Sequence, residues 1–243
     1  NPFAPIAFDD VSNGAEPRHR SGQILFPAPQ ISMSGCSPRE LLRSLKAAAG
    51  AAGPSLGIPV GVPLQAWLRP VATRKARIKA DDVTRLTQWR NRHVNSFLTE
   101  FTATESQTVR WLTETVGPDD TRILFMLDDL QARTFGYMGL AFINWENMSG
   151  EADAIVRGED APRGLMTEAL RALLGWAKGQ LGLSGINVRV RSDNTALQFY
   201  LKFGFNEHCR VPLRKTEQNG KIVWVEDATL ISSPLTLVHM RLG

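Results

Sequence analysis

The chain has 243 residues, enough for one large domain or for one domain with an appendage, and its 28 lysine and arginine residues against 24 aspartate and glutamate residues give a net charge of +4. The basic residues are scattered, without an aromatic-basic motif or zinc-finger spacing, which argues against nucleic-acid binding, and no apolar run is long enough to cross a bilayer. Only Cys36 and Cys209 occur, and the four histidines share no ligand spacing, so we expect no disulfide framework, no metal site and a reducing cytoplasm.

The first 70 residues differ in texture from the rest because they hold ten of the 14 prolines. Proline fixes the backbone and removes a hydrogen-bond donor, so regular structure is interrupted repeatedly. One helix is predicted here, from a cap at Ser37 with Pro38 at its first position to an end near Gly50. The Gly/Pro-rich stretch 53–63 is typical of a linker or of a segment lying over a neighbouring surface. Residues 1–70 are therefore interpreted as an extension, either a tail draped over the following domain or a partner, or the stump of an upstream domain.

Strands and helices alternate from about Leu68 onward. The pattern predicts a strand at 73–78, a helix from Asp81 or Asp82 to Arg92, another from Thr104, antiparallel strands at 123–127 and 135–143, and a strand at 152–156.

The helix that begins after Gly164 is the clearest element of the chain. Apolar residues repeat on it at intervals of three and four from Met166 to Leu181, and Gly182 ends it. A strand with alternating apolar residues follows at 186–190, and then a helix from Asp193 or Asn194 to Lys202. This order predicts a mixed α/β fold in which helices cover a central sheet.

Two segments of this region carry chemistry. At the first, Gly164 lets the backbone approach a ligand closely, and the amides of Leu165, Met166 and Thr167 point out of the helix start, where the helix dipole favours a pyrophosphate. A glycine before a helix is also a common turn, so this signal alone is weak.

The second segment follows about thirty residues later. Asn194 either caps its own helix or also reaches a ligand, and Tyr200 lies six positions further on. An aromatic residue at helical spacing usually belongs to the core. A tyrosine hydroxyl nevertheless needs a polar partner, which is a reason for Tyr200 to face a cleft.

Taken together and in this order, these segments resemble the GNAT superfamily of acyl-CoA-dependent N-acyltransferases, over roughly residues 71–243. The resemblance rests on the turn and helix from Gly164 to Leu170, the strand ending at Ser192, and the run from Asn194 through Tyr200 to Phe205. The segment 86–91, Leu-Thr-Gln-Trp-Arg-Asn, is similar to the first helix of members that modify amino sugars or ribosomal-protein termini.

The resemblance implies a mostly antiparallel central sheet flanked by helices, and acetyl-CoA as the acyl donor. It implies that Tyr200 protonates the departing thiolate and that the strand at Ile155 and Val156 lends backbone hydrogen bonds to the pantetheine arm. The remaining cofactor-binding residues that it implies are Arg163, Gly164, Leu165, Met166, Thr167 and Asn194.

The chain also departs from the family pattern. Ala161 stands where an arginine or glutamine is usual, and Met166 stands where a second small residue is usual, so Met166 either turns inward or obstructs the cofactor. The general base is open among Glu151, Asp153 and Glu146, and water alone is a credible alternative because carboxylates at strand starts are mostly solvated.

The function expected from these features is acetyl transfer to a primary amine of a small molecule, with an amino sugar, free or linked to a nucleotide, as the acceptor suggested by Trp89, Arg90 and Asn91. Two alternatives stand beside it. One is acetylation of a protein N-terminus, which needs an open groove. The other is a degenerate, non-catalytic CoA-binding scaffold, which Ala161 and Met166 motivate. No nucleic-acid or membrane partner is expected, and a homodimer is left open.

Overall fold

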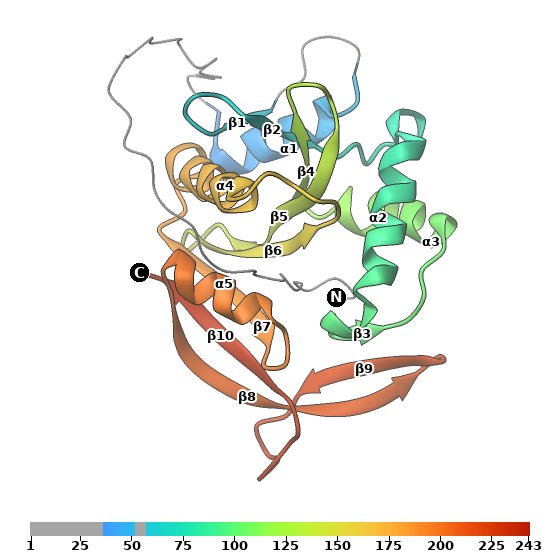
Figure 1. The fold of residues 1–243 in the computed structure, drawn as a ribbon, viewed down its shortest axis with the longest axis vertical. Coiled ribbons are helices and arrows are strands. Elements are labelled where there is room, and N and C mark those ends of the chain that lie inside the picture. The colour runs from blue at the N-terminus through green and yellow to red at the C-terminus, as the bar shows by residue number, and fades with distance from the viewer. Residues whose placement is uncertain (1–35, 52–56) are drawn as a thin grey trace.

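The computed structural model describes residues 36–51 and 57–243. Their strands form one sheet in the order β1-β2-β4-β5-β6-β7-β10-β8-β9-β3, in which β6 and β7 are parallel and the other neighbours are antiparallel (Figure 1). The expected mixed, mostly antiparallel sheet flanked by helices is confirmed. No helix of the described segments is long and apolar enough to span a membrane.

The elements have the following bounds. The strands are β1 Ile58–Val60, β2 Ala66–Pro70, β3 Thr99–Glu100, β4 Ile123–Asp129, β5 Thr134–Asn144, β6 Ser149–Arg157, β7 Gly185–Arg191, β8 Phe205–Gln218, β9 Lys221–Glu226 and β10 Thr236–Leu242. The α-helices are α1 Pro38–Ala48, α2 Ala80–Arg92, α3 Glu105–Arg110, α4 Leu165–Leu181 and α5 Ala196–Phe203.

The N-terminal half of the sheet, from β1 to β6, is covered on both faces (Figure 1). On one face α1 and α4 pack on the strands, and Leu170 and Leu173 of α4 share a core with Phe125 and Ile155. On the other face α2 and α3 pack on Leu124, Met126, Tyr137 and Val156. Burial on both faces explains why β4 is continuously apolar from Ile123 to Leu127 rather than alternating.

Trp89 of α2 anchors the second of these faces. Its ring is fully buried, stacks on Tyr137 at 6.2 Å between ring centroids, and donates from Nε1 to Glu159 Oε1 at 2.8 Å. Gly158 lies under the same ring, so closely that a Cβ atom there would stand 2.1 Å from it. The stack fixes α2 against the end of β6.

The parallel strands β6 and β7 separate soon after they meet. They pair only from Ser149 to Glu151 with Gly185 to Asn187, while β6 continues to Arg157 and β7 to Arg191. The facing edges of the two strands therefore make no ladder with each other beyond Glu151. The sheet opens there into a V, defined here as the space between residues 152–157 of β6 and 188–191 of β7.

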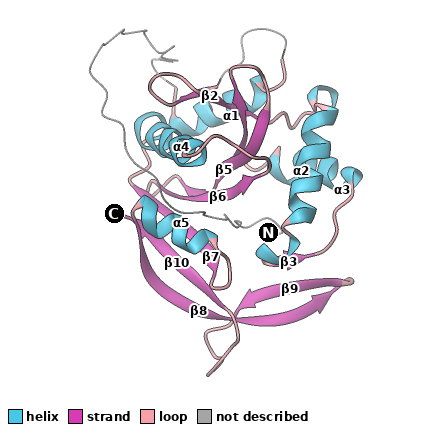
Figure 2. Ribbon diagram, in the orientation of Figure 1, coloured by secondary structure: helices cyan, strands magenta, loops and turns pink. Residues whose placement is uncertain are grey.

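The C-terminal half of the sheet is covered differently. In Figure 2, α5 lies against β7 and β10, while the β8–β9 hairpin extends beneath β3. The short strand β3 pairs with β9, so the connection between α2 and α3 is joined to this hairpin. Arg191 at the end of β7 strengthens the junction, because it donates to Phe97 O and to Glu100 Oε1, which also accepts from Trp224 Nε1 at 2.7 Å.

Two expectations about the start of the fold need correction. The sheet does not begin after residue 70, because β2 pairs with β4 and β1 pairs with β2. The predicted strand at 73–78 is wrong as well: Lys75–Arg77 form a 3-10 turn, whose Arg77 donates to Ala47 O of α1. The helix predicted from Ser37 is confirmed, with Ser37 and Glu40 capping each other. The linker expected at 53–63 lies partly outside the described residues, and its last part contains β1.

Candidate functional site

The start of α4 is open, as the sequence predicts. Gly164 has φ +82°, which an L side chain rarely adopts, and a Cβ atom there would meet nothing within 4 Å. The amides of Met166 and Thr167 donate to no backbone acceptor in the described parts of the chain. Leu165 departs from the expectation, since its amide donates to Pro162 O at 3.0 Å and is not free for a ligand. Two amides and the helix dipole thus face outward at Gly164.

The side chains around this turn leave it unobstructed. Met166 and Leu165 are both buried in the core beneath α4, so the bulky Met166 turns inward. Ala161 is half-buried and packs on the same core, and Arg163 is exposed next to Gly164. The departures of Ala161 and Met166 from the family pattern therefore do not close the helix start.

β6 presents its backbone to the V. Ala154 has φ +53°, and the register with β5 shifts there, so residues 154 and 155 stand opposite the single residue Met138. This is a β-bulge, which leaves a ladder locally incomplete. The side chains of Ile155 and Val156 are buried on opposite faces, so only their backbone groups are placed to contact a ligand in the V.

Tyr200 is fully buried, which corrects the expectation that it faces a cleft with a polar partner. Its ring packs edge-on against Phe199 and Phe205, and its hydroxyl makes no hydrogen bond to any described residue. Burial, and then the nearby Asp153 carboxylate, raise the pKa of Tyr200 above its ordinary value. Leaving a buried hydroxyl without a hydrogen bond is costly, so a bound group that reached it would be stabilised by it.

Asn194 serves its own helix, the first of the two roles considered for it. The residue is buried, and its Oδ1 accepts from Ala196 N at 2.9 Å at the start of α5. Its place at the end of the loop after β7 fixes where α5 begins. Through α5 it fixes the position of Tyr200.

Asp153 is the buried carboxylate of the site. It is 5% exposed. Arg122, the residue before β4, places its Nη1 3.4 Å from Asp153 Oδ2. Burial raises the pKa of Asp153 to about 6, against the opposing charge of Arg122 and with a smaller contribution from Glu151. A carboxyl group with this pKa is ionised at neutral pH and still basic enough to accept a proton.

The other two candidate bases are less suited. Glu151 is held by Arg189, whose Nε lies 2.9 Å from Oε2, and Arg189 also contacts Glu226 at 3.3 Å. Glu146 is exposed in the β5–β6 turn, away from the bulge. Of the three, only Asp153 is both buried and located at the bulge of β6.

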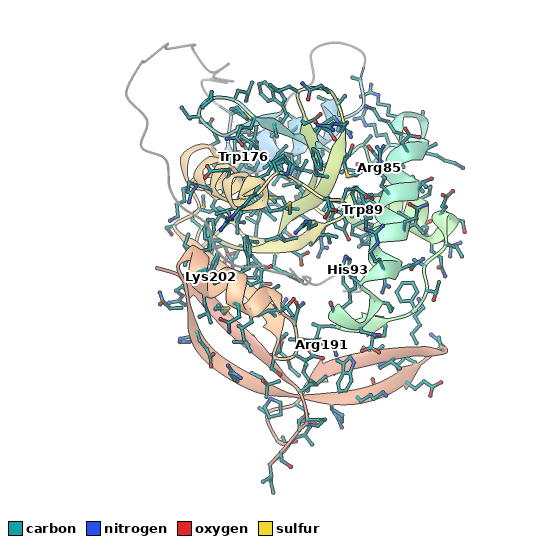
Figure 3. The ribbon with its side chains drawn as sticks, viewed as in Figure 1. Arg85, Trp89, His93, Trp176, Arg191 and Lys202 are labelled. Atoms are coloured by element: carbon teal, nitrogen blue, oxygen red, sulfur yellow. The ribbon has the colours of Figure 1, made fainter. Side chains whose placement is uncertain are left out.

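Several residues that lie near the V were not predicted from the sequence. Arg122 and Arg189 flank the ring of Phe142 at 5.5 and 4.9 Å, and Phe142 itself is 43% exposed with φ +52°. Arg191 lies between the end of β7 and the β8–β9 hairpin (Figure 3). The sheet register brings these residues together. The positive φ of Phe142 has no local sequence signal.

The segment Trp89, Arg90 and Asn91 has a structural role. Trp89 packs on Tyr137, as above, and Figure 3 shows it on α2 beside the sheet. Arg90 is fully buried and donates to the carbonyls of Thr99 and Phe101, while the Asn91 side chain pairs with the backbone of Ala103. The side chains of Arg90 and Asn91 thus hold the connection between α2 and α3, and Trp89 holds α2 on the sheet.

No group of three or more histidine, cysteine, aspartate or glutamate residues in the described segments could hold a metal ion.

Residues 74–206, more than half of the chain, match the family described as the acetyltransferase (GNAT) domain. No curated protein matches the chain. Among solved structures, the fold is similar to the spermidine/spermine N-acetyltransferase SpeG from Vibrio cholerae in complex with manganese ions, with 19% identity over 73% of this chain and 92% of that chain and a TM-score of 0.51. It is also similar to a probable acetyltransferase of the GNAT family from Chromobacterium violaceum, with 16% identity over 90% of this chain and 96% of that chain and a TM-score of 0.58.

Proposed function

Because the chain belongs to the GNAT acetyltransferase family, we propose that it transfers an acetyl group from acetyl-CoA to the primary amine of a small molecule, with the V between β6 and β7 as the reaction site. The observation that supports this best is the hydroxyl of Tyr200, which is buried and lacks a hydrogen-bond partner among the described residues. A bound group that reaches this hydroxyl would satisfy it.

The residues present fit acetyl-CoA. The open amides of Met166 and Thr167 and the exposed Arg163 suit its phosphates, and the unpaired edge of β6 at Ile155 and Val156 suits its amide-containing arm. When bound, acetyl-CoA supplies the thioester carbonyl and the sulfur leaving group.

Two proton positions follow from the protein itself. The raised pKa of Tyr200 keeps the proton on its Oη at neutral pH, so the residue is a proton donor for a leaving thiolate and not a base. Asp153, with a pKa near 6, is ionised and can take the proton of an incoming ammonium, directly or through water. We assign Asp153 rather than Glu151 to this role because Arg189 holds Glu151.

A small acceptor is favoured over a protein N-terminus. The ladder between β3 and β9, reinforced by Arg191, Glu100 and Trp224, joins the two segments that border the α2 side of the V. An extended peptide needs an open groove, and a junction at the end of β7 leaves less room for one. The amino-sugar acceptor loses its sequence basis, because Trp89, Arg90 and Asn91 are occupied within the fold.

The charges beside the V do not match a polycation. Asp153, Glu151 and Glu100 each contact an arginine, namely Arg122, Arg189 and Arg191. A long polyamine requires carboxylates that are free to receive it. We therefore propose an acceptor with a single amine, unlike the substrates named for the Vibrio cholerae enzyme.

The scaffold alternative predicts CoA binding without turnover, and the inward side chain of Met166 weakens its motivation. The experiment that separates the two is calorimetric titration with acetyl-CoA, followed by turnover on a panel of primary amines, amino sugars and peptides, for wild type and Tyr200→Phe. We expect unchanged acetyl-CoA binding and a turnover reduced by about 10²-fold or more in the variant.

The same variant has a built-in control. Tyr200→Phe removes a hydroxyl that has no partner in the described structure, so the free energy of unfolding should stay constant or rise. A variant that loses both stability and activity would argue against a proton-donor role, and robust turnover by Tyr200→Phe would refute it. Absence of acetyl-CoA binding by wild type would refute the proposed function. Sedimentation of the same sample tests the homodimer.

A further inference from the structure

A polar pocket of about 160 Å³ lies where β6, β7, β8 and β10 meet, on the face of the sheet opposite α5. The apolar residues Val188 and Met240 alternate with the polar ones and belong to the core under the helices. The polar residues that line the pocket are Glu151, Asn187, Arg189, His208, His239 and Arg241.

Part of this lining is internally paired. Arg189 lies between Glu151 and Glu226, and His239 Nε2 stands 3.0 Å from Glu226 Oε2. These contacts engage the two carboxylates nearest the pocket. They leave its remaining polar side chains to determine which ligand it takes.

Arg241 and His208 are the remaining basic side chains of the lining. Neither side chain makes a hydrogen bond or an ion pair with another described residue, although both line the same pocket. His208 is placed there by a β-bulge: His239 pairs with Cys209 and Met240 with Glu207, so His208 is the extra residue of β8. Bulges commonly redirect a side chain toward a site.

The pocket adjoins the reaction site. Glu151 and Asn187 form the last pair between β6 and β7 before the V, and both line the pocket. Asp153 is two residues beyond Glu151 on β6, which is about 7 Å along a strand. A ligand anchored in the pocket can therefore hold an amine near Asp153 with a spacer of only a few bonds.

We propose that this pocket binds an anionic group of the acceptor, a phosphate or a carboxylate, through Arg241 and His208, so that the acceptor is a small amine that also carries a negative charge. The inference rests on the proposed function, because it names the class of amine that the same site uses. A guanidinium and an imidazole that lack protein partners are the donors that oxyanions prefer.

The first test is binding of inorganic phosphate to protein saturated with CoA, which blocks the helix start at Gly164 as a competing phosphate site. We expect calorimetric binding to the wild type, weakened about tenfold in Arg241→Gln and lost in the double variant Arg241→Gln, His208→Gln. The matched control is Arg210→Gln, which removes an exposed arginine of β8 that pairs with Glu207 and does not line the pocket. It should bind phosphate as the wild type does.

The second test compares matched amines: ethanolamine with phosphoethanolamine, and glycinamide with glycine. In at least one pair, the amine that carries the phosphate or carboxylate should have a KM about tenfold lower than its partner. Arg241→Gln should reduce that preference, while Arg210→Gln should keep it. The two pairs distinguish phosphate from carboxylate as the preferred group.

Equal KM values within both pairs, or phosphate binding that is absent or unaffected by the double variant, would overturn the inference. If acetyl-CoA binding and turnover persist in that case, the proposed function stands and only the anion pocket is wrong. If acetyl-CoA does not bind, the proposed function itself fails, and phosphate binding measured without CoA, with the same Arg241 and His208 variants, then decides the pocket alone.

Discussion

The two halves of the sheet are built differently, and the difference locates the site. The half from β1 to β6 is buried between α1 and α4 on one face and α2 and α3 on the other. In the half formed by β7, β10, β8 and β9, α5 packs on one face and polar side chains such as Arg189 and His239 occupy the other. The first half is packed on both faces, and the second offers a polar surface. Among the described residues, the strands of the two halves pair directly at Ser149–Glu151 of β6 with residues 185–187 of β7.

This contrast shows how an acyltransferase fold can form a cleft without a separate domain. Two halves of a sheet that share a short parallel pair and then diverge leave backbone groups unpaired inside a protein core. Those groups, the buried hydroxyl of Tyr200 and the carboxyl of Asp153 come from different elements that the divergence brings to one place. Mutations should therefore act on stability in the first half and on chemistry at the junction.

The largest expected loss of stability comes from a cavity in the half from β1 to β6, which is packed on both faces. Trp89→Ala removes a fully buried ring that stacks on Tyr137, and should lower the free energy of unfolding by about 3–5 kcal/mol in denaturant titrations. The comparison in the other half is Val225→Ala on β9, which is 38% exposed and should change stability by less than about 0.5 kcal/mol. Equal effects would mean that the halves do not differ in packing.

At the junction, Asp153→Asn tests chemistry rather than packing. The kcat/KM of the wild type should rise with pH up to about 6 and level off, because Asp153 must be ionised to accept a proton. The variant should be about 10²-fold slower and should lack this rise. Glu151→Gln is the matched control and should keep the rise near pH 6. A pH profile of Asp153→Asn that equals the wild-type profile would exclude Asp153 as the base.

The contribution of Asp153 to the free energy of unfolding should change with pH in a defined direction. The raised pKa of Asp153 means that the folded state binds more protons than the unfolded state between about pH 4 and pH 6. Relative to Asp153→Asn, wild-type stability should therefore fall as the pH rises through this range, because the other carboxyl groups are common to both proteins. Chemical denaturation at pH 4.5 and pH 7 measures it.

A smaller effect is expected where the halves are joined. Glu100 accepts from Arg191 and from Trp224, each at 2.7 Å, so Glu100→Ala removes two hydrogen bonds between β3, β7 and β9. We expect a loss of about 1.5–3 kcal/mol, with faster amide exchange in β9. Glu100→Gln retains an acceptor oxygen and should lose less. Unchanged exchange in β9 would show that the junction does not depend on this carboxylate.

The parts of the fold that local patterns specify were predictable. The periodicity from Met166 to Leu181 predicts α4, and Gly182 ends it in the left-handed conformation that glycine favours. The strands β1 and β2 were not predictable from local pattern, because Pro59 and Pro70 argue against strands. The structure tolerates Pro59 because β1 is an edge strand, and Pro70 because it ends β2.

The site divides in the same way. The open helix start after Gly164 follows from the sequence, because a glycine and a long amphipathic helix are local features. The contact of Arg122 with Asp153 joins positions 31 residues apart and depends on the pairing of β4, β5 and β6. The burial of Tyr200 likewise depends on how α5 packs, so a helical aromatic in the sequence does not reveal that its hydroxyl lacks a partner.

The smallest predicted effect concerns the helix that precedes the sheet. The ammonium of Lys46 on α1 donates to Val116 O and Asp119 O, each at 2.5 Å, and burial lowers the pKa of Lys46 to about 8, against the attraction of Asp119 and Asp120. The unfolded state therefore binds more protons than the folded state above about pH 8, so wild-type stability should rise with pH there. Relative to Lys46→Met, the wild type should gain about 1 kcal/mol between pH 7 and pH 9 in denaturant titrations. Lys46→Arg is the control that keeps the charge, and should show no such gain because arginine does not titrate in this range. A wild type whose stability relative to Lys46→Met is independent of pH would mean that α1 does not hold a buried charge against the turn before β4.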